Sequence, residues 1–229
     1  MEAFLIIAIV GAAAWFFLSG TYKTSVQSPE TMRGHELEDS FIELKKRILV
    51  TSPYTDEKGY ERLYYRIKKV LGQIIARHQH YVLDVEAQDA GLHLIFMKRE
   101  HRDSNGLPYY EYIVPSDLDL APIKSDVLLY LCFFLYLGGQ AKGVGAVEES
   151  PRTMLRILDY LIAERDYPPA SFYKGMVMKY GEKVYSDTNS SRARELLETA
   201  QQKGVGAAAM ELTHLSKFAQ LDAIKSIHP

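Results

Sequence analysis

Histidines are the side chains of this sequence that could do chemistry at close spacing. His78 and His80 would share one face of an extended segment, and His93 lies on the next strand that the pattern predicts. His101 follows a few positions later. Imidazole groups bind zinc and act as general acids or bases near neutral pH. These four histidines suggest one hypothesis for function, a hydrolase that acts close to a membrane through a site in the middle of the chain.

The surroundings of these histidines favour a plainer interpretation. No cysteine or acidic ligand at a recognised spacing completes a metal site around His78, His80 and His93. They are equally typical of polar residues at the end of a helix and the edge of a strand. We therefore expect no metal and no cofactor, and we keep the hydrolase as the competing hypothesis.

Two further groupings lack the context that catalysis needs. Asp117 and Asp119 precede a predicted helix, where carboxylates commonly cap the first turn. Ser171, His214 and Asp187 can be combined into a triad only on paper, because no serine lies in a nucleophile elbow. Neither grouping predicts an active site.

A glycine-rich run, Gly138–Gly145, could be mistaken for a phosphate-binding loop. It contains no Gly-Lys-Ser/Thr step, and Glu148 occupies the third glycine position of a dinucleotide fingerprint that would begin at Gly143. We expect residues 141–149 to form a flexible hinge between two parts of the chain.

Charge excludes one class of partner. The chain has 27 basic and 29 acidic residues, for a formal net charge of −2, and no basic stripe that would indicate nucleic-acid binding. Its single cysteine, Cys132, excludes an internal disulfide. The composition is typical of a folded globular body.

The N-terminus has the pattern of a membrane anchor. Residues 3–18 carry no charge, and Trp15 and Tyr22 stand where interfacial aromatics are expected. We predict a single transmembrane helix at residues 1–22, followed by a juxtamembrane linker at 23–35. A buried core helix is the alternative. Basic residues after the run, from Lys23 onward, favour a globular part on the cytoplasmic side of an inner membrane.

Residues 36–140 combine two kinds of periodicity. Apolar residues repeat every three or four positions in 35–50 and 56–78, which predicts amphipathic helices. Alternation in 81–86, 92–97 and 109–114 predicts three strands, joined in part by a turn at 103–106. The apolar run 127–137 predicts a central core helix. The expected fold is α+β and mainly α-helical, with a small three-stranded antiparallel meander between helical halves.

Small residues recur at regular positions in the last third of the chain. Alanine lets helix backbones approach closely, and glycine adopts the positive φ that ends a helix and reverses the chain. These positions share one register with a few larger residues: Gly181, Val184, Asp187, Ala193, Ala200, Gly204, Ala208 and Leu212. The pattern predicts stacked antiparallel helix pairs in residues 150–229.

This register resembles the Sel-one-like repeat family, a branch of the helical-repeat proteins related to tetratricopeptide repeats. The resemblance covers about residues 150–217. The second copy fills the glycine, valine, aspartate and alanine places, although Ala193 comes two residues late. In the worn first copy, Asp166 stands where a glycine is usual and Met178 where an aromatic is usual. The resemblance implies a surface that binds other proteins.

The preferred hypothesis is a membrane-anchored, non-catalytic protein-protein interaction module whose partner is another protein. The resemblance suggests a bacterial envelope, secretion-associated or toxin-immunity role, and it leaves a periplasmic orientation open. Tyr167, Tyr173 and Tyr180 are the candidate partner-binding residues, because aromatic side chains are enriched at interfaces. A helical core uses the same residues, so a packing role is the alternative. A purely structural homo-oligomer is a third possibility.

Overall fold

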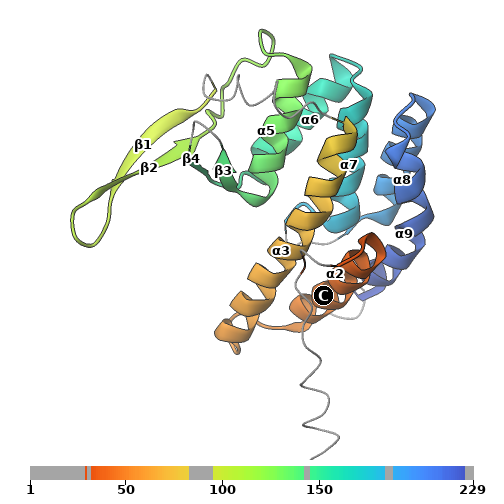
Figure 1. Ribbon diagram of the computed structural model, residues 1–229, viewed down its shortest axis with the longest axis horizontal. Coiled ribbons are helices and arrows are strands. Elements are labelled where there is room, and N and C mark those ends of the chain that lie inside the picture. Colours follow the sequence, from red (N-terminus) through yellow and green to blue (C-terminus); the bar gives the residue numbers. More distant parts are fainter. Residues whose placement is uncertain (1–28, 30–31, 83–94, 142–144, 184–187, 225–229) are drawn as a thin grey trace, which may run out of the picture. The chain divides into compact units, whose positions relative to one another are not determined.

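The computed structural model describes residues 29, 32–82, 95–141, 145–183 and 188–224. Contacts divide the chain into Met1–Arg33 and Gly34–Pro229, and every helix and strand below belongs to the second unit. Its elements follow one another in this order (Figure 1): α2 (Gly34–Val50), α3 (Glu57–Val82), β1 (Met97–Arg102), β2 (Pro108–Ile113), α5 (Ser125–Leu137), β3 (Gly139–Ala141), β4 (Gly145–Val147), α6 (Pro151–Ala163), α7 (Pro168–Tyr180), α8 (Ser190–Gln202) and α9 (Ala207–Ile224).

The predicted N-terminal transmembrane helix has no counterpart among these elements. Residues 1–22 lie outside the described part of the chain, as does most of the predicted linker 23–35, whose last two residues instead begin α2. Within the described ranges, every helix is too short or too polar to cross a bilayer.

The predicted three-stranded antiparallel meander is wrong. The described sheet has four strands in the order β1-β2-β4-β3, and β2 pairs with β4 in parallel. Tyr81 and Val82, placed in a first strand by their alternation, end α3, and the rest of that segment lies outside the described residues. An alternating pattern of only six residues does not exclude a helix, because a helix that begins earlier in the chain can continue into such a short segment.

Two other parts of the sheet differ in how well the sequence predicted them. The strand at 109–114 is confirmed as β2, and the turn before it is confirmed as well: Asp103 Oδ1 accepts hydrogen bonds of 2.8 Å from the backbone N–H groups of Asn105 and Leu107. In the region predicted as a hinge, 141–149, residues 142–144 lie outside the described part of the chain, and Gly145–Val147 form β4, which pairs antiparallel with β3.

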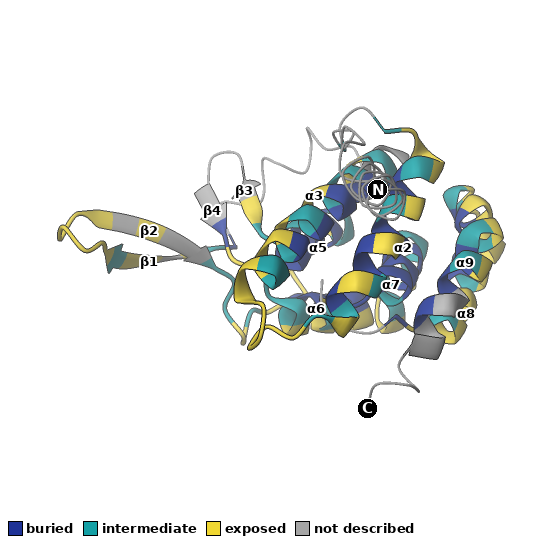
Figure 2. Cartoon of the chain, turned by 90° about the horizontal axis from the view of Figure 1, so that it is seen from below, coloured by how far each residue is buried: buried dark blue, intermediate teal, exposed yellow. Residues whose placement is uncertain are grey.

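Helix α7 lies at the centre of the helical packing. Nine of its thirteen residues are buried, and it contacts α6, α8 and α9. Pro168 begins the helix, where a missing N–H costs nothing, and Gly181 ends it with a φ of 99°. Buried residues, dark blue in Figure 2, gather where α2, α5 and α7 face other helices. The core helix predicted at 127–137 is confirmed as α5.

The helix pairs predicted for the last third of the chain are present as α6 with α7 and α8 with α9. Ala193, Ala200 and Ala208 are fully buried, as predicted. Gly204 turns the chain between α8 and α9 with a φ of 93°. At the equivalent place between α6 and α7, Asp166 has a φ of 46° and is the one described non-glycine residue with positive φ.

Close contact between α7 and α8 depends on Gly175. A Cβ atom at this position would lie 2.9 Å from Leu197 Cγ and 3.4 Å from the Ala193 carbonyl oxygen. We expect Gly175→Ala to lower the free energy of unfolding by about 1–2 kcal/mol, because a well-packed core resists added volume. The matched change Gly72→Ala in α3 meets nothing within 4 Å. It should raise stability by about 0.5–1 kcal/mol through helix propensity. Urea denaturation measures both, and equal signs would contradict the packing argument.

The positive φ at Asp166 predicts a difference between two substitutions. Asp166→Ala and Asp166→Gly both remove the ion pair that this carboxylate makes with Lys203. Only alanine retains the steric cost of a left-handed backbone, which is about 1–2 kcal/mol. We expect the glycine variant to be more stable than the alanine variant by about that amount in thermal unfolding. Equal melting temperatures would show that the turn relaxes without cost.

Candidate functional site: a buried charge cluster beside a recess

A fully buried lysine connects three helices. Lys179 lies in the last turn of α7 and its side chain has no solvent exposure. Its Nζ donates hydrogen bonds to Glu38 Oε1 of α2 at 3.0 Å and to Glu211 Oε2 of α9 at 2.7 Å. It also lies 4.5 Å from the centre of the Phe218 ring, within cation–π range. Burying an ion is costly unless it is paired and hydrogen-bonded, and Lys179 meets both conditions.

Two histidines extend this group. His78 Nε2 of α3 lies 2.6 Å from Glu211 Oε1, and His78 Nδ1 lies 2.7 Å from the Ile74 carbonyl oxygen. His214 Nδ1 of α9 lies 2.9 Å from Glu38 Oε2, as an ion pair without hydrogen-bond geometry. We call Glu38, His78, Lys179, Glu211 and His214 the buried charge cluster. It connects α2, α3, α7 and α9.

The cluster keeps Glu211 ionised. Burial alone would raise the pKa of this carboxyl, but the hydrogen bond from His78 and the charges of Lys179 and His78 lower it to about 2. Glu211 therefore contributes stability above its usual pKa of 4.5 and loses that contribution as the pH falls toward 2. At neutral pH it is a held anion and not a proton donor.

The C-terminal end of α7 is held by two more buried side chains. Lys45 of α2 donates from Nζ to the carbonyl oxygens of Tyr180 and Lys183, both at 3.3 Å. Tyr136 of α5 donates to the carbonyl oxygen of Gly181. Carbonyls at the end of a helix have no partners within the helix, so these contacts replace water there. These contacts fix the end of α7 and so position Lys179, which lies in the last turn of the helix.

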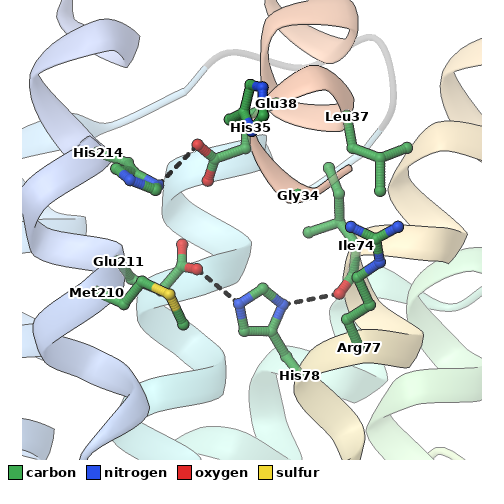
Figure 3. A pocket seen from close by; sticks show the side chains of 10 residues that line it. All are labelled: Gly34, His35, Leu37, Glu38, Ile74, Arg77, His78, Met210, Glu211 and His214. Atoms are coloured by element: carbon green, nitrogen blue, oxygen red, sulfur yellow. Dashed lines mark hydrogen bonds and ion pairs between the residues drawn. The ribbon is translucent and has the colours of Figure 1, made fainter. Parts of the chain in front are cut away.

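A recess of about 480 Å³ opens beside the cluster, between α2, α3 and α9 (Figure 3). Apolar side chains and the polar groups of the cluster share its wall. Met210 of α9 is 47% exposed there. We call it the α2–α9 recess and define it by its lining residues: Gly34, His35, Leu37, Glu38, Ile74, Arg77, His78, Met210, Glu211 and His214.

The cluster is better arranged for holding helices than for catalysis. Both ring nitrogens of His78 already face oxygen atoms, and both oxygens of Glu211 are bound, so neither group is poised to take a proton from a substrate. Lys179 occupies the position between the carboxylates that a metal cation would need. Among the residues that the structure describes, no three His, Cys, Asp or Glu side chains come together as a metal site.

The tyrosines predicted to bind a partner are mostly in the core. Tyr173 is 2% exposed and packs against Phe133, with ring centres 4.4 Å apart. Tyr180 is 1% exposed and packs edge-on against Phe41. These two side chains have the packing role that the sequence left open as the alternative. Tyr167, just before α7, is half-buried, so for this residue the partner role stays a prediction.

The structure does not assemble the four histidines of the hydrolase hypothesis into one described site. His78 belongs to the buried charge cluster, whereas His101 lies on β1. His93 and the side chain of His80 lie outside the described residues. The three residues that could be combined into a catalytic triad are also not shown together. Ser171 is buried, His214 pairs with Glu38, and Asp187 lies outside the described residues.

The sequence analysis missed the carboxylates and the lysines of this region. A signal for them existed: Glu38 and Lys45 interrupt the apolar stripe of α2, and Lys179 follows the apolar run of α7. A charge inside an apolar stripe requires a partner, but the sequence alone does not say which of 29 acidic residues supplies it.

Comparison of the chain with protein-family models, with curated proteins and with solved structures gives no match.

The pairing of Lys179 predicts a large effect of its removal. Lys179→Met leaves Glu38 and Glu211 facing each other without their shared cation, and we expect the free energy of unfolding to fall by about 3–5 kcal/mol. The control Lys203→Met removes an exposed ion pair with Asp166 and should cost less than about 1 kcal/mol. Chemical denaturation compares the two. Similar costs for both variants would show that the buried pairs contribute no more than surface ones.

Proposed function

We propose that the helical body of this chain is a non-catalytic protein-binding module, and that a partner protein docks a side chain into the α2–α9 recess. The observation that supports the proposal is the recess itself. It offers exposed Met210 above the buried side chains of Leu37 and Ile74, beside polar groups that already pair with one another. Such a surface favours binding, because its charges do not need a ligand to neutralise them.

The size and lining of the recess suit an anchoring side chain. Binding sites are concave, mostly apolar and provided with a few placed polar groups. In protein interfaces, a small number of side chains that fill such pockets supply most of the affinity. Methionine adapts its shape to different contacts, and Met210 is the large apolar residue exposed at this place.

The helix pairs provide a scaffold for this recess. Met210, Glu211 and His214 belong to α9, whose position depends on its pairing with α8. Close packing through Gly175 and the buried alanines agrees with the binding scaffold that a Sel-one-like repeat would form. Membership of that family, and an envelope, secretion-associated or toxin-immunity role, are part of the proposal and rest on the sequence pattern. Location at a membrane rests on the uncharged run 3–18 alone.

Site-specific photocrosslinking tests the recess as the contact. A benzophenone amino acid at position 210 of the full-length chain should capture one partner protein in the cells that express it. The same group at Glu198, exposed on α8, serves as the matched control and should capture little. Capture at 210 should be lost when His35→Glu adds a negative charge to the recess.

Two outcomes would contradict the proposal. Equal capture at positions 210 and 198 would show non-specific contact. Capture at 210 that survives His35→Glu would place the partner elsewhere, because this change alters the lining of the recess.

A further inference from the structure

His78 makes two contacts that a neutral imidazole cannot satisfy together. Its ring nitrogens lie 2.7 Å from the Ile74 carbonyl oxygen and 2.6 Å from Glu211 Oε1. Both oxygens only accept hydrogen bonds, since a backbone carbonyl carries no proton and Glu211 is ionised. An imidazole provides two N–H donors only when it is protonated. The geometry is therefore that of a positively charged His78.

The burial of this contact leads to the same conclusion. Glu211 lies against His78 and shares Lys179 with Glu38. The side chain of His78 is only 13% exposed, so water screens its contact with the Glu211 carboxylate poorly. A buried carboxylate favours a charged hydrogen-bond partner over a neutral one.

We propose that the proton on His78 is a latch: it holds α9 against α3, and its loss at higher pH weakens the contact between His78 and Glu211 and changes the shape of the α2–α9 recess. Without that proton, one nitrogen lone pair would face an oxygen at hydrogen-bond distance, and the ring would have to turn away from Ile74 or from Glu211. Met210 is the next residue to Glu211, so movement of α9 there alters the wall of the recess.

The surroundings of His78 set the direction of its titration. Burial by itself lowers the pKa of His78, but the hydrogen bond and charge of Glu211, together with the Ile74 carbonyl, outweigh it and raise the pKa above the usual 6.5. Lys179 opposes this shift. Charged and titratable groups face His78 from all four helices: His35 and Glu38 on α2, Arg77 on α3, Lys179 on α7, and Glu211 and His214 on α9.

The sign of the effect follows from the raised pKa. Unfolding returns His78 to its usual pKa of 6.5, so the latch stabilises the fold fully below about pH 6.5. Its contribution is lost as the pH rises through the higher pKa of the folded state. The latch itself depends only on the geometry around His78, whereas its control of partner binding rests on the proposed function of the recess.

Imidazole NMR tests the latch directly. In the full-length chain, labelled with ¹⁵N and held in detergent, His78 should keep protons on both ring nitrogens to a higher pH than an ordinary imidazole, whose pKa is about 6.5. The spectra of wild type and His78→Gln identify the resonance. A ring that loses its second proton at or below the pKa of an ordinary imidazole would overturn the proposal.

Thermal unfolding of two variants gives an independent test. His78→Gln is always neutral and His78→Lys is always charged at these pH values. As the pH rises through the pKa of folded His78, the melting temperature of wild type should fall relative to that of the lysine variant. Above that pKa, the melting temperature of wild type should approach that of the glutamine variant. A wild type that parallels the glutamine variant over the whole range would overturn the latch even if the lysine variant does not fold.

Crosslinking from position 210 separates the latch from the proposed function. If the latch controls binding, capture of the partner falls between pH 6 and 9 in wild type and stays constant in His78→Lys. Capture that does not change with pH in wild type would overturn the control of binding. Absence of capture at every pH would count against the recess as a partner site, while the NMR result would still decide the latch.

Discussion

The most demanding constraint in this fold is the burial of Lys179. A lysine ammonium with no access to water needs charged partners at hydrogen-bond distance, and here they come from the start of α2 and from α9, far apart in the sequence. Glu38 and Glu211 can both reach Nζ only if α2, α7 and α9 keep one relative position. Replacement of these ions by apolar residues could be as stable, so their value is in specifying one arrangement of the helices. The recess beside Glu211 lies between three helices, two of which, α2 and α9, supply the carboxylates that bind Lys179.

The same helix explains why the rest of the core can pack around Lys179. Gly175 removes a side chain where α8 crosses α7, so Leu197 and the Ala193 backbone come into direct contact with the α7 backbone. Lys45 and Tyr136 bind the carbonyl groups at the end of α7, which would otherwise be buried without partners. Together, the glycine at position 175 and the polar contacts at the end of α7 allow a helix with nine buried residues to carry a charged side chain in its last turn. Small residues thus bring the backbones together, and polar contacts fix their register.

Sequence reasoning worked best where a pattern was long. The helix predicted at 56–78 is confirmed within α3, the core helix at 127–137 is confirmed as α5, and the burial of Ala193 and Ala200 was expected from their register. It failed where a short alternation competed with an established helix, as at Tyr81 and Val82. It also took the glycine-rich run for a hinge, although β3 and β4 form there by pairing with each other and with β2. Strand pairing of three residues leaves no readable period, so local sequence could not predict it.

By itself, the sequence determined which segments are amphipathic, where small residues let helices approach, and that basic and acidic residues are nearly balanced, at 27 and 29. Amphipathic segments and small-residue positions can be read from the spacing of nearby residues, and the charge balance can be read from composition. Only the tertiary structure decided that Tyr173 and Tyr180 are buried in the core, that His78 lies against Glu211, and that Lys179 lies between two carboxylates. The physical reason is the range of the interactions. Hydrogen bonds and ion pairs act over a few ångströms between residues that may be separated by more than a hundred positions, and no local pattern records which of them meet.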